Sequence, residues 1–319
     1  MKETQLPETY NYIAVFPTMR CNLDCGFCLN AFSNDFIRGK FNTISPPEWI
    51  DGLNRINTRK GVPITFGGGE PFVYYGFIDV INGIKSETEI DILTNLRWGK
   101  KGIDLFIEKV NPKRLKRNAS YPSIRISYHP GQKFMDPKSL VEDAKRLQNA
   151  GFSLGIYSVQ YPSSEQLQAI TQMQFRCADA GILFRVKDFT GKYNGTIYGD
   201  YSKFPGATKY SFPDMNGGIP FLESREIQIT KGIETKLVDC KTSELIIGPN
   251  ADVYRCHRDL YAEKLSIGNL LDHNFEIKDI FLSCSLYGIC NPCDVKVKTN
   301  YKQEIGNTSV EITNIKDAN

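Results

Sequence analysis

The sequence lacks a strong net charge, a long apolar run and any repeated or low-complexity segment. Its 39 lysines and arginines nearly balance its 36 aspartates and glutamates, and a net charge of +3 is too small to predict binding to nucleic acid or to a membrane. No apolar stretch approaches the roughly 20 residues of a membrane-spanning helix. The polar first segment, MKETQLPETYNY, does not resemble a signal peptide. We therefore expect a cytoplasmic protein without a nucleic-acid or membrane partner.

The chain does contain many cysteines, nine in all. Thiols stay reduced in the cytoplasm, and an odd number of cysteines cannot all be paired in disulfides. Metal binding therefore explains the cysteines better than a disulfide framework does.

Strand-like and helix-like segments alternate over the first 189 residues. Short connections between such segments predict a parallel sheet, because parallel neighbours are joined by helical crossovers. Six strands are too few to close an eight-stranded barrel, so we predict an α/β fold with a partial (β/α)6, TIM-like barrel whose functional residues gather at the C-terminal ends of the strands. The predicted strands are 12–16, 62–66, 89–95, 123–129, 152–160 and 182–189, and the predicted helices are 46–57, 77–84, 101–110, 136–151 and 163–181.

The second half of the chain follows another pattern. Residues 190–220 are rich in Gly, Tyr, Phe and Pro without any period, which is typical of either a connecting loop or a substrate lid. Residues 243–258 predict a β-hairpin that turns at Pro249 and Asn250. The predicted organisation is a partial barrel, a linker or lid, a small C-terminal hairpin domain and a polar tail, at 1–189, 190–235, 236–295 and 296–319.

Three cysteines follow the first predicted strand with Cys-x3-Cys-x2-Cys spacing: Cys21, Cys25 and Cys28. A structural zinc ion takes four protein ligands, and iron–sulfur clusters are normally held by four cysteines. A four-iron cluster held by three cysteines keeps one coordination position open, where another molecule can bind. A zinc site with a distant fourth ligand is the alternative interpretation.

The segment GGGEP, residues 67–71, follows the second predicted strand. Three glycines let the backbone approach a ligand closely, and the Glu70 carboxylate is suited to accept hydrogen bonds from an ammonium group. A tight turn is the alternative explanation for the glycines.

With these two motifs, and with the aromatic Phe27 directly before the last cysteine, the chain resembles the radical S-adenosylmethionine (radical SAM) enzymes. The resemblance implies that the three cysteines hold a [4Fe–4S] cluster whose open iron binds S-adenosylmethionine (AdoMet). It also implies reductive cleavage of AdoMet to a 5′-deoxyadenosyl radical, which removes a hydrogen atom from the substrate. The candidate AdoMet-binding residues are Gly67, Gly68, Gly69 and Glu70. Asn95, Ser127 and Arg185 on later strands are further candidates, and each is also compatible with an ordinary strand-end role.

The C-terminal part carries five further cysteines: Cys240, Cys256, Cys284, Cys290 and Cys293. A two-residue spacing such as that of Cys290 and Cys293 is common in metal-chelating turns, and a structural zinc with four thiolates is compatible with the spacing. The region resembles the Twitch domain, a shortened SPASM domain, in a layout similar to that of aminocyclitol (2-deoxy-scyllo-inosamine) dehydrogenases. The resemblance implies one auxiliary [4Fe–4S] cluster held by Cys240, Cys256, Cys290 and Cys293.

Two cysteines remain unassigned. Cys177 lies in a helical pattern and is predicted to belong to the core. Cys284 is predicted to be a packing residue, and its alternatives are a ligand that replaces Cys240 or a hydrogen-atom donor in catalysis.

The predicted function is an oxidation of a small, sugar- or aminocyclitol-like substrate, in which the auxiliary cluster accepts an electron and a flavodoxin- or ferredoxin-type protein supplies the reductant. Since the first strand is predicted near Tyr12, we expect no N-terminal recognition domain of the kind that many peptide-modifying relatives carry, and this expectation favours a small-molecule substrate. The alternatives are an epimerase with a cysteine hydrogen donor, a peptide (RiPP) maturase and, more remotely, a non-catalytic iron–sulfur or zinc protein.

Overall fold

The fold is taken from a computed structural model that describes residues 3–25, 28, 44–160, 163–188, 191–193, 196–198, 236–287 and 310–317. Several predicted features lie outside these residues: Phe27, Cys290, Cys293, most of the linker 190–235 and most of the tail 296–319.

A nine-stranded sheet forms the centre of the structure, in the order β14-β13-β12-β2-β4-β5-β6-β7-β8. The six strands from β2 to β8 are parallel to their neighbours and follow one another in chain order. Within the described part of the chain the sheet is open, with β14 and β8 at its two edges. The parallel strands are β2 (Tyr12–Val15), β4 (Ile64–Phe66), β5 (Ile90–Thr94), β6 (Ile124–Tyr128), β7 (Leu154–Gln160) and β8 (Leu183–Asp188).

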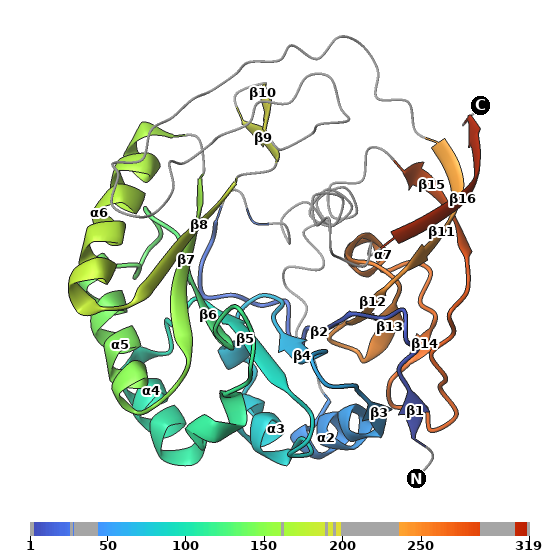
Figure 1. Ribbon diagram of the computed structural model, residues 1–319, viewed down its shortest axis with the longest axis horizontal. Helices are drawn as coiled ribbons and strands as arrows, with labels where there is room; N and C mark the ends of the chain where they lie inside the picture. The colour runs from blue at the N-terminus through green and yellow to red at the C-terminus, as the bar shows by residue number, and fades with distance from the viewer. Residues whose placement is uncertain are drawn as a thin grey trace.

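Five helices connect these strands and lie in an arc along the outside of the sheet (Figure 1). They are α2 (Pro46–Arg55), α3 (Phe77–Gly83), α4 (Gly99–Lys109), α5 (Pro137–Asn149) and α6 (Ser164–Ala180). Each buries an apolar stripe, for example Ile103 and Phe106 of α4, against alternate strand residues such as Ile92 and Ile124. The α/β class and the parallel order of the strands are therefore confirmed, and the partial barrel stays a prediction.

Local sequence signals explain where the helices begin and end. The side chains of Asp136 and Ser163 accept hydrogen bonds from the first-turn amides of α5 and α6, as N-cap residues do. Helix α6 ends at Gly181, which has φ of +64°, a conformation that glycine adopts at low cost. These caps agree with the predicted ends of the two helices to within a few residues.

The C-terminal hairpin belongs to the central sheet. Strands β12 (Glu244–Ile247) and β13 (Asp252–Tyr254) are antiparallel, and β12 pairs in parallel with β2 along its whole length. A short helix, α7 (His257–Ala262), follows β13, and β14 (Gly268–Asn269) completes the sheet edge. The predicted hairpin is thus present, and its first strand lies beside β2, which leads to Cys21.

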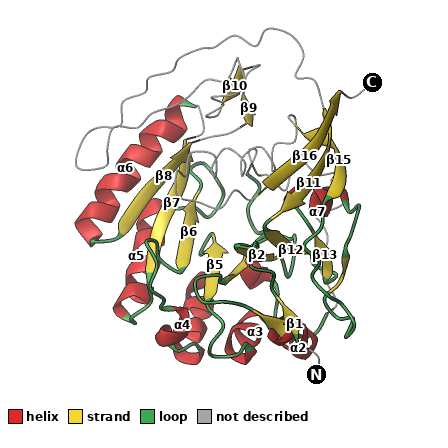
Figure 2. Ribbon diagram, turned by 45° about the vertical axis from the view of Figure 1, so that its right-hand side comes forward, coloured by secondary structure: helices red, strands yellow, loops and turns green. Residues whose placement is uncertain are grey.

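Three smaller sheets complete the structure. Strand β11 (Lys236–Thr242) lies between β15 (Leu282–Tyr287) and β16 (Val310–Asp317), near the C-terminus in Figure 2. The two-residue strands β1 (Thr4–Gln5) and β3 (Ile56–Asn57) pair with each other, as do β9 (Gly191–Tyr193) and β10 (Thr196–Tyr198). None of the described helices combines the length and apolar character that a membrane span requires.

Candidate functional site

The glycine-rich segment runs beside the backbone that leads into the cysteine loop. The amide of Gly67 donates to the Val15 carbonyl oxygen at 3.0 Å, that of Gly69 to Thr18 at 3.0 Å and that of Glu70 to Arg20 at 2.8 Å. These hydrogen bonds continue the pairing of β2 and β4 beyond the ends of both strands. The two sequence motifs are therefore in direct contact, up to the residue before Cys21.

The close approach of these segments requires glycine. A Cβ atom on Gly69 would lie 2.0 Å from the carbonyl oxygen of Arg20, and one on Gly68 would lie 2.4 Å from that of Thr18. Gly68 also has φ of +111°, which side-chain-bearing residues rarely adopt. The three glycines thus have a structural reason beside any contact with a ligand, since they let the second motif pack against the first.

The Glu70 carboxylate lies in a cradle of protein donors. It is 1% exposed and accepts hydrogen bonds from the Thr94 hydroxyl at 2.8 Å, the Asn95 amide at 2.7 Å, the Trp98 indole at 3.2 Å and the Phe72 amide at 3.3 Å. Burial raises the pKa of Glu70 to about 7, against these hydrogen bonds, which lower it. The contacts show that Glu70 organises the loop after β5, and its predicted role in binding an ammonium group stays a prediction.

Asn95 extends from this loop to the cysteine segment. Its side-chain amide nitrogen donates to the Cys21 sulfur at 3.7 Å and to the Asn22 side-chain oxygen at 2.7 Å, while the Asn22 amide donates to the Arg97 carbonyl oxygen. The sequence indicates Asn95 as a candidate AdoMet contact, but it does not indicate this link to Cys21. It could not have been read from spacing, because Asn95 and Cys21 are 74 residues apart.

The three cysteines differ in their environment. Cys21 is exposed, Cys25 is buried and Cys28 is intermediate, and the Cys28 amide donates to the Cys25 carbonyl oxygen at 3.1 Å. Among the described residues, no three His, Cys, Asp or Glu side chains are arranged to hold a single metal ion. In a four-iron cluster each cysteine binds a different iron, so the cysteine sulfurs do not have to converge on a single point as they would around one metal ion.

Ser127 and Arg185 lie in one row of the sheet, together with Tyr157. The register pairs Ser127 of β6 with Tyr157 of β7, and Tyr157 with Arg185 of β8. Since Ile126 and Tyr128 are buried on the helix side, the row faces the opposite, inner side of the sheet. The sheet thus brings both predicted residues to the same face and adds Tyr157, which sequence reasoning missed.

Cys240, Cys256 and Cys284 come from β11, from the start of α7 and from β15. On β11 and β15, Cys240 is opposite Leu282 and Val238 is opposite Cys284, so the two cysteines share one face as diagonal neighbours. Cys177, in contrast, lies on the buried face of α6, where burial raises its pKa to about 12. The expectation that Cys177 belongs to the core is confirmed.

His257 follows Cys256 and lies against the inner face of β2. Its ring is 6.3 Å from that of Tyr12, 5.6 Å from that of Phe16 and 6.1 Å from that of Tyr261, and its Nδ1 atom is 3.8 Å from the Glu244 carboxylate. The start of α7 therefore packs against the inner face of the sheet, which is also the face that carries Ser127, Tyr157 and Arg185.

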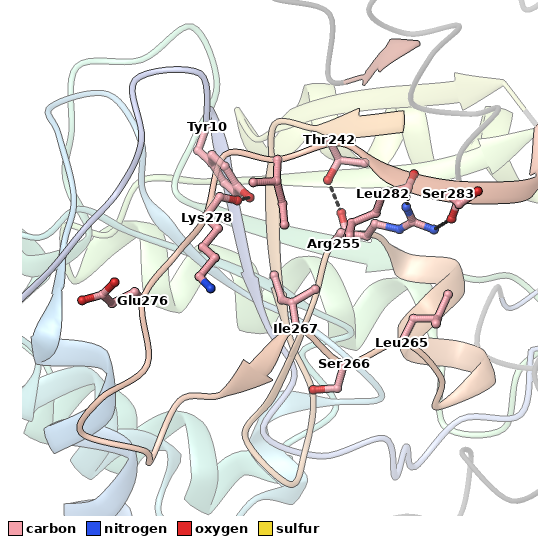
Figure 3. Close-up of a pocket in the computed structure, with 11 residues that line it drawn as sticks. Tyr10, Thr242, Arg255, Leu265, Ser266, Ile267, Glu276, Lys278, Leu282 and Ser283 are labelled. Carbon is pink, nitrogen blue, oxygen red and sulfur yellow. Dashed lines mark hydrogen bonds between the residues drawn. The ribbon is translucent and has the colours of Figure 1, made fainter. Parts of the chain in front are cut away.

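A pocket of about 430 Å³ lies on the C-terminal part of the structure (Figure 3). Its lining includes Tyr10, Thr242, Arg255, Ile267, Lys278 and Leu282, and none of the described cysteines is among its lining residues. The pocket is thus separate from the contact between the two N-terminal motifs.

Residues 15–171 match the family model described as the Radical SAM superfamily. This range includes the three-cysteine loop, the glycine-rich segment and the strands from β4 to β7. The match covers just under half of the chain, and over this range the chain is similar to a radical SAM domain.

Solved structures with a similar fold include SuiB from Streptococcus suis, at 16% sequence identity and a TM-score of 0.50. The alignment covers 83% of this chain, and the chain spans 64% of the length of SuiB. A structure of polyhistidine-tagged anSMEcpe with bound AdoMet has 14% identity and a TM-score of 0.49, with coverage of 83% of this chain and 78% of that one. No curated protein matches the chain.

Proposed function

We propose that this protein cleaves AdoMet reductively and removes a hydrogen atom from its substrate. The observation that carries the proposal is the hydrogen-bonded contact between the GGGE segment and the backbone before Cys21. The contact places a cysteine loop with one ligand too few for a closed cluster next to a glycine-rich, polar strand end.

The residues present fit the implied [4Fe–4S] cluster and AdoMet. Cys21, Cys25 and Cys28 would hold three irons, and the Asn95 amide at the Cys21 sulfur would orient that ligand by a hydrogen bond. When bound, the reduced cluster and AdoMet together supply a 5′-deoxyadenosyl radical. Glu70 keeps the loop after β5 in place. The close contact of Gly68 and Gly69 with the backbone before Cys21 holds the glycine-rich segment against the cysteine segment.

The row of Ser127, Tyr157 and Arg185 would line the same inner face. We assign Ser127 to a hydrogen bond with AdoMet and Arg185 to its carboxylate, because a guanidinium binds a carboxylate with two parallel hydrogen bonds. Tyr157 lies between them in register and would complete the contact surface.

The proposed reaction is the oxidation of a small, sugar- or aminocyclitol-like substrate. Cys240, Cys256, Cys290 and Cys293 would hold an auxiliary cluster able to accept one electron from the substrate radical, while a base would take up the proton that the substrate loses. A flavodoxin- or ferredoxin-type protein would reduce the first cluster. Epimerisation and peptide modification are the competing outcomes. Mass spectrometry of 5′-deoxyadenosine formed with deuterated candidate substrates identifies the substrate, because only the true substrate transfers deuterium. The mass of the product formed from unlabelled substrate then distinguishes oxidation, which removes two hydrogens, from epimerisation, which leaves the mass unchanged.

Replacement of Cys21 by Ala tests the proposal directly. The reconstituted variant is expected to form no 5′-deoxyadenosine above background, whereas Cys177→Ala, which changes a core cysteine, is expected to form it at a rate close to that of the unchanged protein. Chromatographic quantification of 5′-deoxyadenosine under reducing, anaerobic conditions provides the measurement. If the Cys21→Ala variant cleaved AdoMet as fast as the unchanged protein, the assignment of Cys21 as a cluster ligand would be excluded.

A further inference from the structure

Two arginines share one aspartate on the inner face of the sheet. Asp91 of β5 is fully buried, and Arg117 donates to both of its carboxylate oxygens at 2.7 Å, through Nε and one terminal nitrogen. Two parallel hydrogen bonds of this kind are the strongest arrangement that a guanidinium and a carboxylate form. Arg117 by itself therefore neutralises Asp91.

Arg125 of β6 is the surplus cation of this group. It donates only to the Asp91 oxygen that Arg117 already contacts, at 3.3 Å. Its Nε atom is buried, and no group in the described part of the chain accepts a hydrogen bond from it. Two arginines and one aspartate leave a charge of +1. A partly buried charge without a partner is costly, and a ligand of opposite charge removes that cost.

The Arg125 side chain is open toward the inner side of the sheet. It keeps 18% of its surface exposed. Its register partner on β7 is Gly155, so that strand contributes no side chain to cover it. The Tyr121 ring lies 4.9 Å from the Arg125 guanidinium, but it carries no formal charge that could balance the arginine. A ligand can therefore reach the guanidinium from this side.

Arg125 lies on the same face as Ser127, Tyr157 and Arg185. It precedes Ser127 by two residues, which places it about 7 Å closer to the N-terminal ends of the strands. Burial raises the pKa of Tyr157, and the positive charges of Arg185 and Arg125 act to lower it, so the phenol lies within electrostatic range of both arginines. A small molecule on this face can thus contact Arg125 beside the residues assigned to AdoMet.

The charge of the group selects the chemistry of its ligand. A guanidinium with a free edge binds a carboxylate or a phosphate through parallel hydrogen bonds. With Arg185 assigned to AdoMet, one surplus positive charge remains, and a single carboxylate balances it. A phosphate dianion would leave one negative charge without a partner, and a neutral sugar would leave Arg125 uncompensated.

We propose that Arg125 binds a carboxylate of the substrate, and that the substrate is a small hydroxylated acid, such as a sugar acid, rather than a neutral sugar or cyclitol. Tyr157 lies beside this contact. The inference rests on the proposed function, because it names the substrate class of that reaction.

The experiment measures ligand binding to the full-length chain by ligand-observed NMR, with AdoMet in excess and without a reductant, so that no turnover occurs. The two probes are D-glucuronate and D-glucuronamide, which have nearly the same size and the same hydroxyl groups but differ in charge. The variants are Arg125→Gln, Arg125→Lys and the matched control Arg114→Gln. Arg114 is also partly buried and donates to backbone carbonyl oxygens, those of Ile84, Lys85 and Thr88, so its replacement removes the same charge without changing the Asp91 group.

The unchanged protein is expected to bind glucuronate more tightly than glucuronamide. Arg125→Gln is expected to bind glucuronate about tenfold or more weakly and to lose this preference, because a hydrogen-bonded ion pair is removed. Arg125→Lys should have an intermediate affinity, because it keeps the charge without the planar fork. Arg114→Gln should match the unchanged protein.

Equal affinity for the two probes, or no binding of glucuronate by the unchanged protein, would overturn the carboxylate site. Full glucuronate affinity in Arg125→Gln would overturn the role of Arg125, and if that variant fails to fold, full affinity in Arg125→Lys would do the same. None of these results bears on AdoMet cleavage, which is measured separately as 5′-deoxyadenosine. Absence of AdoMet cleavage in a protein that binds glucuronate through Arg125 would instead overturn the proposed function and leave the carboxylate site in place.

Discussion

At the scale of single residues, the most informative group is the Glu70 carboxylate. It has four protein donors and almost no exposure, so it acts as a connector between the glycine-rich segment and the loop after β5. Asn95 has a similar role toward Cys21. Both residues position the cysteine loop from a neighbouring strand end, a function that neither residue type discloses in the sequence.

The raised pKa of Glu70 predicts how stability changes with pH. Its folded value of about 7 exceeds the ordinary value of 4.5, so the folded protein binds this proton more tightly than the unfolded chain does. The stability that this proton contributes to the folded state is fully present below pH 4.5 and is lost as the pH rises through 7. The expected loss of folding stability over this range is about 3 kcal/mol.

Urea unfolding of the iron-free protein at pH 5 and pH 8 measures this effect. Glu70→Gln lacks the titrating group. The free energy of unfolding of the unchanged protein, minus that of this variant, should therefore be smaller at pH 8 than at pH 5. A difference that stays constant, or that grows with pH, would contradict the assignment.

At the scale of elements, the central feature is the contact between the segments after β2 and β4. It extends the parallel ladder through glycines that leave no room for a side chain. The hairpin extends the sheet beside β2. Residues of the hairpin and α7 form one buried cluster with Ala14 and Phe16: Ile246, Tyr254, Leu260 and Tyr261. The cysteine loop is thus supported by a strand end on one side and by the C-terminal region on the other.

The glycine contact predicts a strong effect of Gly69→Ala. The added Cβ would collide with the Arg20 backbone, which cannot move without moving Cys21. We expect a destabilisation of about 2 kcal/mol or more, with reduced iron content, measured by urea unfolding and iron analysis.

Gly61→Ala is a suitable comparison, because that glycine has φ of +85° and no atom within 4 Å of the added Cβ. It should cost only the strain of the positive φ, about 1 kcal/mol, with normal iron content. Equal iron content in the two variants would show that the contact at Gly69 does not support the cluster.

At the scale of the whole molecule, the N-terminal and C-terminal parts form one sheet. Strand β12 pairs with β2 along its whole length, and the buried Arg55 of α2 donates to the carbonyl oxygens of Leu270 and Asp272. The N-terminal strands and helices therefore depend on the C-terminal region for a complete sheet and for part of their helix contacts.

This arrangement predicts that residues 1–235 do not form a stable protein alone. Without β12, strand β2 becomes an edge with unpaired backbone groups, and its apolar inner face loses its cover. We expect the truncated chain to aggregate, as measured by size-exclusion chromatography and sedimentation. A soluble monomer with a cooperative thermal transition would contradict the prediction.

The sequence by itself determined the order of the elements and the two motifs by which the chain resembles the radical SAM enzymes. Hydrophobic periodicity and capping residues located all six parallel strands and their helices, since these signals are local. The three-cysteine loop and the GGGEP segment were recognisable because each is continuous in the chain. The metal ligands themselves stay a prediction, with Cys290 and Cys293 outside the described residues.

Only the tertiary structure decided which distant residues meet. The donors around Glu70, the link from Asn95 to Cys21, the row of Ser127, Tyr157 and Arg185, and the contact of Asp91 with Arg125 all join residues from separate strands. Such contacts follow from strand order, register and burial, which depend on the packing of the whole chain rather than on any short stretch of it.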